Sequence, residues 1–187
     1  MGVAIWDGAR LCSGLRMNKI DLQHDALTRY LATLLAAYFE LLPVGRILQY
    51  PFIMQIDDAI YQPDIQIVLR TNPAELSDTA LRGAADICIE VVAPESTKRD
   101  HGDLFAAYEQ AGVAEYWIVD GLRHESRFYR LGDNGRYVRV SEEADGHYRT
   151  PRLAQFRLNV STLWEAPLPG PLAIGAMVRA MVQRESN

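Results

Sequence analysis

Two acidic residues stand in or beside apolar runs, where a charged side chain is costly to bury. Asp64 opens the run 64–69 (DIQIVL), and Glu90 lies within the run 87–92 (ICIEVV). Both runs are typical of buried strands. A carboxylate in such a place needs a cation, a hydrogen-bond partner or a raised pKa. If neighbouring strands bring both acids to one point, their oxygens, with water, suit Mg²⁺ or Mn²⁺. Arginine partners, or exposure at a strand end, would satisfy them equally well.

Other residues follow these acids in a fixed order. Pro63 precedes Asp64, EVVAPEST occupies residues 90–97, Asp100 and Tyr108 come next, and AGVAEYWIVD occupies residues 111–120. This ordered set resembles the Uma2 family, also called DUF820, within the PD-(D/E)XK nuclease superfamily. The resemblance is dense from residue 62 to about residue 131, and weaker over residues 18–61 and after residue 132.

The resemblance implies a fold and an activity. The expected fold is α/β and restriction-endonuclease-like, with a mixed β-sheet flanked by helices, a C-terminal β extension and a terminal helix. The implied activity is metal-dependent hydrolysis of phosphodiester bonds in DNA. In that chemistry Mg²⁺ or Mn²⁺ polarises the phosphate and lowers the pKa of the attacking water.

The site that the resemblance implies contains two catalytic acids. Asp64 and Glu90 are the expected metal ligands, and the backbone carbonyl of Val91 is a candidate third ligand. Four side chains are auxiliary candidates in this sequence: His24, Lys98, Asp100 and Tyr108.

The sequence departs from the superfamily at the positions where a lysine is expected. Val92 stands two residues after the strand acid, and Leu104 occupies the lysine position of the following helix. Asp100, Leu104 and Tyr108 share one helix face, so a lysine at 104 would point where they point. Leucine can neither orient an attacking water nor stabilise charge. Two alternatives to an active nuclease therefore stay open: a catalytically impaired relative acting as a binding or regulatory module, and acids with a purely structural role.

Charged residues near two helix starts each allow two interpretations. His24 belongs to a helix expected from Leu22 to about Leu42, and Uma2-like proteins commonly carry a histidine near its start. It either faces the acids or is a surface or capping residue, and a one-residue signal favours the latter. Lys98 and Arg99 oppose the dipole of the helix that begins at Ser96 or Thr97. The two side chains either lie near an acidic group or a phosphate, or are simply exposed to solvent.

Composition narrows the class of protein. The chain has 187 residues, 49% apolar and 23% charged, which suits a single domain over residues 1–187 with its core at about 18–131. A net charge of −5 does not favour a broad DNA-binding surface, although a local basic patch could still bind. Two cysteines are too few for a disulfide framework. No apolar run reaches the roughly 18 residues of a membrane span, and no signal peptide is recognisable, so the expected location is cytoplasmic.

The remaining elements are expected from local patterns. Residues 72–82 are expected to be a mobile loop, and residues 127–140 a hairpin turning at GDNG. Further strands near Tyr148 and over 156–158 are expected to extend the sheet. A last helix over about 172–185 carries an apolar stripe that would dock either on its own domain or on a second subunit, forming a homodimer.

Overall fold

The main sheet of the molecule is mixed and has six strands. The computed structural model describes residues 21–93 and 102–183. The strand order is β1 (Gly45–Gln49), β4 (Ile65–Leu69), β7 (Ile87–Val91), β8 (Glu115–Asp120), β9 (Glu125–Leu131) and β10 (Tyr137–Val140). Only β7 and β8 are parallel neighbours in this sheet. The apolar runs at 64–69 and 87–92 thus contain the strands that the sequence predicted, and the structure shows that these strands, β4 and β7, are adjacent.

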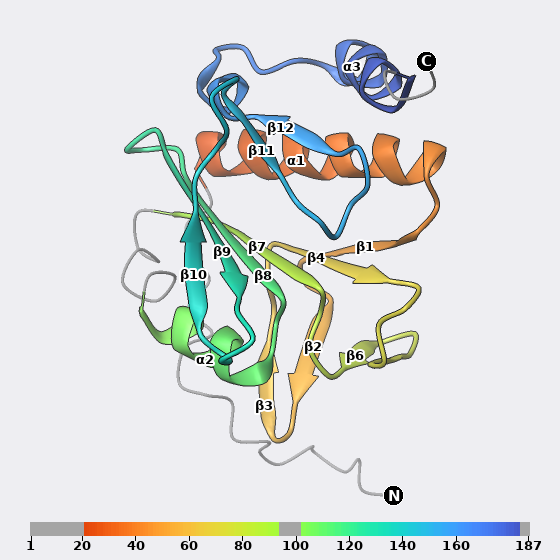
Figure 1. The fold of residues 1–187 in the computed structure, drawn as a ribbon, viewed down its shortest axis with the longest axis vertical. Coiled ribbons are helices and arrows are strands. Elements are labelled where there is room, and N and C mark those ends of the chain that lie inside the picture. Colours follow the sequence, from red (N-terminus) through yellow and green to blue (C-terminus); the bar gives the residue numbers. More distant parts are fainter. Residues whose placement is uncertain (1–20, 94–101, 184–187) are drawn as a thin grey trace, which may run out of the picture.

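Helices cover both faces of this sheet (Figure 1). The helix α1 (Leu22–Leu41) begins at Asp21, whose side chain accepts the His24 N–H, and ends just before Pro43. The helix α2 (Leu104–Ala111) lies on the other face and ends at Gly112, whose φ of 82° suits glycine. The start expected for α2 at Ser96 or Thr97 falls outside the described residues.

The alternation of side chains along β7 separates two apolar cores. Ile87, Ile89 and Val91 pack with α1 in the larger core. Cys88 and Val92 pack with Tyr108 of α2 in the second core. Because successive strand residues point to opposite faces, Glu90 lies on the α2 face with Cys88 and Val92.

A second sheet packs against the α2 face, and part of it corrects the sequence analysis. Its strands are β3 (Ala59–Tyr61), β2 (Ile53–Ile56), β6 (Ala80–Arg82) and β5 (Glu75–Leu76), in that order. We expected residues 72–82 to be a loop, and this expectation was wrong, because the segment contains the two short strands β5 and β6. Leu81 pairs with Met54 across β2 and β6, and both side chains are buried in the second core. Strands this short show too little alternation to be recognised from sequence.

The later strands extend the main sheet only in part. β9 and β10 form the expected hairpin at its edge. β11 (His147–Arg149) and β12 (Arg157–Asn159) instead form a separate ribbon, followed by a 3₁₀ helix, η2 (Val160–Trp164). Tyr148 and Leu158 are buried in the larger core, which holds the ribbon on the α1 side.

One buried carboxylate ties this ribbon to the sheet. Glu115 accepts hydrogen bonds from Trp117 Nε1 at 2.9 Å, from the Tyr148 hydroxyl at 2.8 Å and from Thr150 Oγ1 at 2.7 Å. Arg130 Nε lies 3.3 Å from the same carboxylate. A buried charge with this many partners is fully compensated inside the protein.

The last helix, α3 (Pro171–Gln183), docks on its own chain. It packs on α1, on the side away from the sheet (Figure 1). Ile174, Val178 and Met181 of its apolar stripe are buried in the larger core, whereas Met177 and Val182 are half-buried. The chain itself therefore covers most of this stripe. In the described part of the chain, no helix is long and apolar enough to cross a membrane.

The docking of α3 can be tested through stability. Ile174→Ala removes a side chain that is 1% exposed, and we expect it to lower the free energy of unfolding by about 2–5 kcal/mol. Leu172→Ala, on the same helix but 94% exposed, is the matched control and should change it by less than about 0.5 kcal/mol. Urea denaturation of both variants measures the difference. Equal, small losses would mean that α3 is not part of the folded core in solution.

Candidate functional site

The Asp64 carboxylate lies where the start of α1 meets the end of β7. Asp64 immediately precedes β4, and its Oδ2 accepts the N–H of Val91 at 2.8 Å. His24 Nε2 lies 3.3 Å from the same oxygen. The Asp64 side chain is 17% exposed, so a group from solvent could still reach it. Backbone and imidazole thus hold this carboxylate in one orientation.

Glu90 is buried in β7 and contacts α2. Its Oε1 accepts a hydrogen bond from the Tyr108 hydroxyl at 2.9 Å, and the Glu90 residue is 3% exposed. Burial raises the pKa of Tyr108 well above its ordinary value, and the nearby charge of Glu90 raises it further. The Tyr108 hydroxyl therefore keeps its proton and acts as the donor.

The register of β4 and β7 brings the backbones of the two acids to the same end of these adjacent strands. Ile65 pairs with Ile89 in this antiparallel ladder, and Asp64 precedes Ile65 whereas Glu90 follows Ile89. Their carboxylates have different partners: Asp64 contacts His24 of α1, and Glu90 contacts Tyr108 of α2.

The carbonyl of Val91 lies on the same side of β7 as Asp64. The N–H of Val92 donates to the Val119 carbonyl on β8, whereas the N–H of Val91 donates to Asp64. The N–H and C=O of one strand residue point the same way. The Val91 carbonyl therefore shares the side of the strand that carries the acid pair.

The sequence-predicted residues are only partly brought together. His24, Asp64 and Val91 form one contact group, and Glu90 forms another with Tyr108. Our preference for His24 as a surface or capping residue was wrong: the residue is buried, at 8% exposed, and faces the acid. It is Asp21 that caps the helix. Lys98, Arg99 and Asp100 lie outside the described residues.

The two lysine positions of the superfamily are filled by apolar packing. Val92 is 3% exposed in the second core, and Leu104 packs partly buried against the same cluster, one helical turn before Tyr108. Neither side chain can carry charge to the acid pair. In the part of the chain that the structure describes, these two positions offer no cation.

One residue beside the acids was missed in the sequence analysis. Gln66 of β4 is fully buried, and its Nε2 donates to the Phe52 carbonyl at 2.8 Å. Its Oε1 is also buried and has no hydrogen-bond partner among the described residues. The signal in the sequence was a polar residue two positions after Asp64, and hence on the same strand face, inside an apolar run.

These groups suit an ion that retains part of its water shell. The described residues contain no group of three or more histidine, cysteine or acidic side chains arranged to hold a metal. Mg²⁺ is commonly bound through one or two carboxylates and keeps several waters. Two acids, a backbone carbonyl and an unsatisfied amide oxygen fit that description, and they do not fit a four-ligand zinc centre.

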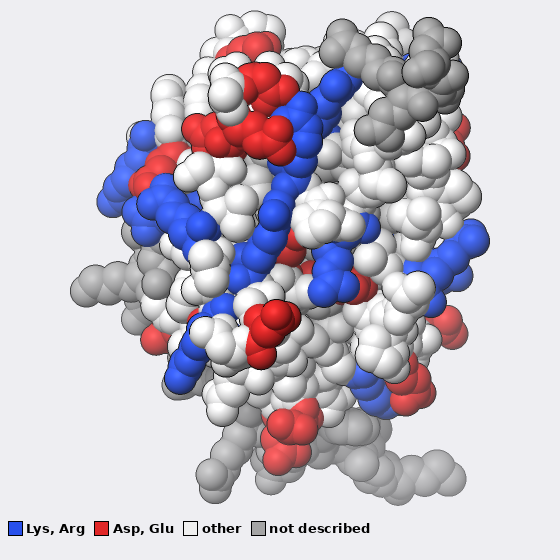
Figure 2. Space-filling model, in the orientation of Figure 1, with Lys and Arg blue, Asp and Glu red and all other residues white. Residues whose placement is uncertain are grey.

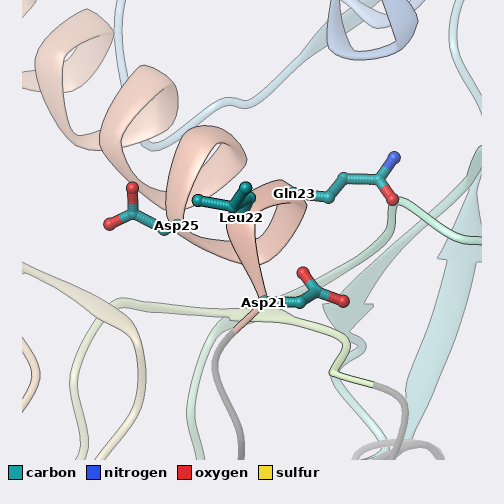
Figure 3. A pocket seen from close by; sticks show the side chains of 4 residues that line it. All are labelled: Asp21, Leu22, Gln23 and Asp25. Carbon is teal, nitrogen blue, oxygen red and sulfur yellow. The ribbon is translucent and has the colours of Figure 1, made fainter.

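An open hollow lies beside the site, at the start of α1. It is lined by Asp21, Leu22, Gln23 and Asp25 (Figure 3). Asp21 caps the helix, and Gln23 Nε2 donates to the Gly121 carbonyl at 2.8 Å. Of the four described side chains that line this hollow, two are acidic and none is basic.

Basic side chains near the acids are interleaved with acidic ones. Arg127 pairs with Ile118, which pairs with Glu90, so all three lie in one row across the sheet. Arg127 Nε is 2.8 Å from Glu125 Oε1, and Arg139 also approaches Glu125, at 3.6 Å. Figure 2 shows a diagonal line of basic side chains with acidic groups on either side. Basic and acidic side chains are therefore mixed on this face, and its described residues form no uniformly positive surface.

The fold defines the class of protein to which the chain belongs. The structure matches a crystal structure described as "a putative nuclease belonging to DUF820" from Anabaena variabilis, with a TM-score of 0.65 and 16% sequence identity. The match covers 77% of this chain and 81% of the other. At this identity the likeness shows the fold alone, which is a restriction-endonuclease-like α/β fold.

The sequence then identifies the family within this class. Residues 15–161 match the Uma2 family model, described as "Putative restriction endonuclease". The chain belongs to the Uma2 family. No curated protein matches it.

The contact between Tyr108 and Glu90 yields a stability prediction. Hydrogen bonds to ionised groups stabilise a fold by about 1.5–3 kcal/mol, and neutral ones by about 0.5–1.5 kcal/mol. At pH 7 we expect Tyr108→Phe to lower the free energy of unfolding by the larger amount. The matched control is Tyr38→Phe, which removes a 2.7 Å hydrogen bond to the neutral Ala154 carbonyl. Equal losses in urea denaturation would show that Glu90 is uncharged in the folded protein.

Proposed function

We propose that this chain is a divalent-metal-dependent endonuclease that hydrolyses phosphodiester bonds of DNA. Asp64 and Glu90 are the catalytic acids and hold Mg²⁺ or Mn²⁺, with the Val91 carbonyl as a third ligand. The proposal is supported by the register of β4 and β7, which brings Asp64, the residue before Ile65, and Glu90, the residue after Ile89, to the same end of two adjacent strands. The bound ion would polarise the scissile phosphate and lower the pKa of the attacking water.

The chain's own residues prepare the two acids for this role. The Val91 N–H and His24 fix the Asp64 carboxylate, and Tyr108 fixes Glu90 from the opposite helix. All of these groups belong to a strand or a helix, or adjoin one. Rigid elements of this kind hold binding groups more accurately than loops do.

In the superfamily pattern a lysine orients the attacking water and stabilises charge, and the proposal assigns this role to neither Val92 nor Leu104. Leu104 and Val92 pack into the second core and cannot orient a water. Lys98 or Arg99, at the start of the same chain segment, stays a prediction for this role, and Asp100 stays a predicted auxiliary residue. The alternative, an impaired family member that serves as a binding or regulatory module, is supported by these two apolar residues alone.

Three further properties belong to the proposal. The partner is nucleic acid, and DNA in particular, contacted through local positions such as Arg127 and Arg139 and without a broad positive surface. A cytoplasmic location stays the expectation from sequence. A homodimer through α3 would have to use the half-buried Met177 and Val182, since Ile174, Val178 and Met181 are already covered.

Plasmid cleavage tests the activity. We expect wild-type protein with Mg²⁺ or Mn²⁺ to nick supercoiled plasmid, and Glu90→Ala to lower the rate by at least about 100-fold, since it removes a proposed ligand of the ion. Asp58→Ala, an exposed acid in the turn between β2 and β3, is the matched control and should cleave as wild type does.

The variant Leu104→Lys separates the two hypotheses in the same assay. Inactive wild type with active Leu104→Lys would identify the impaired relative. If both proteins are inactive on plasmid under all metal conditions, the proposed DNA cleavage is wrong.

Calorimetry tests the metal site independently of cleavage. Mn²⁺ titrated into wild-type protein should give a saturable heat, because the proposal has Asp64 and Glu90 hold one ion. Asp64→Ala should abolish it, whereas Asp133→Ala, at the exposed tip of the β9–β10 hairpin, should leave it unchanged. Equal heats from wild type and Asp64→Ala would remove Asp64 from the metal site.

A further inference from the structure

Gln66 places a polar amide in the buried interior of the main sheet. It lies in β4 between Asp64 and Val68 and is 0% exposed. Only an amide nitrogen can donate to the Phe52 carbonyl, which lies 2.8 Å away, so this bond fixes which end of the amide is oxygen. The orientation of Gln66 is therefore determined by its contact.

The other end of this amide is left unsatisfied. Gln66 Oε1 is buried and accepts no hydrogen bond from the described residues. Burying such an acceptor without a partner costs about 1–3 kcal/mol, and native proteins contain few of them. The oxygen therefore calls for a partner that the described residues do not supply.

The strand register shows which groups surround that oxygen. Gln66 pairs with Cys88 on β7, so Glu90, two residues further along β7 on the same face, is a diagonal neighbour of Gln66. Diagonal neighbours of this kind lie about 7–8 Å apart, within reach of long side chains. Cys88 contacts Met54 Sδ at 3.9 Å, and the pKa of its thiol is raised by burial and by Glu90. The acidic diagonal neighbour of Gln66 on β7 is therefore Glu90, and the basic diagonal neighbour on β1 is Arg46, which is exposed.

We propose that Gln66 is a further member of the cation site. In this proposal Oε1, the end of the amide that Phe52 does not hold, supplies a neutral oxygen to an ion held by Asp64 and Glu90 or to one of its waters. This inference rests on the proposed function, because it needs an ion between Asp64 and Glu90. It adds an uncharged group that raises affinity without adding negative charge near a phosphate.

Replacement by a side chain of equal length tests the proposal. Gln66→Met removes the oxygen, and we expect Mn²⁺ affinity measured by calorimetry to fall about 10–100-fold, as it does for groups supporting a metal site. The matched control is Gln155→Met, which removes another buried amide oxygen that has no partner among the described residues. Gln155 lies far from the acids. It adjoins Ala154, whose carbonyl accepts a hydrogen bond from Tyr38. Tyr38 lies about 21 Å along α1 from His24, which contacts Asp64. The control should bind Mn²⁺ as wild type does.

A second variant keeps the test decisive if Gln66→Met folds poorly. Gln66→Glu places a charged oxygen at the same point and loses the bond to Phe52, so the metal-free protein should unfold at a lower temperature. Mn²⁺ should then raise its unfolding midpoint by more than it raises that of wild type. Unchanged Mn²⁺ affinity in Gln66→Met, or no larger rise in Gln66→Glu, overturns the proposal while leaving the two-acid site intact. Wild-type protein that binds no Mn²⁺ overturns both.

Discussion

The antiparallel register of β4 against β7 is the constraint on which the rest of the candidate site depends. It brings Asp64, the residue before Ile65, and Glu90, the residue after Ile89, to the same end of the two strands. Because side chains alternate along a strand, a slip of one residue would move one acid to the α1 face and its apolar neighbours to the wrong core. The two cores therefore fix the register, and the register fixes the acid pair. In this fold, stability and the geometry of the site have the same origin.

Buried carboxylates in this sheet are handled in two different ways. Glu115 is satisfied inside the protein by Trp117, Tyr148, Thr150 and Arg130, which fits a structural role in fastening the β11–β12 ribbon. Asp64 instead is held by a backbone N–H and an imidazole and stays partly accessible. A carboxylate that is oriented by the protein yet open to solvent suits a ligand from outside. The difference in partners separates the candidate site from the scaffold.

Membership of the Uma2 family fixes the architecture more firmly than it fixes the chemistry. The positions of the two lysines hold Val92 and Leu104, and both side chains contribute apolar contacts to the second core. A lysine at either place would have to bring its ammonium group out of that core or pair it with an acid, at a cost in desolvation. The scaffold has thus adapted to apolar residues there. Catalysis, if it follows the superfamily pattern, has to draw its cation from elsewhere in the chain.

Local sequence patterns determined the elements, and tertiary structure decided which of them meet. The Asp21 cap and Pro43 bounded α1, GDNG specified the β9–β10 hairpin, and the apolar runs marked β4, β7 and β8, because each of these signals acts within a few residues. The family motifs also singled out Asp64, Glu90 and Tyr108. Only the fold showed that His24 faces Asp64, that Gln66 carries an unsatisfied oxygen beside the acids, and that α3 and the β11–β12 ribbon pack on α1. Those contacts join segments tens of residues apart, and their energies depend on pairing and burial that no local periodicity encodes.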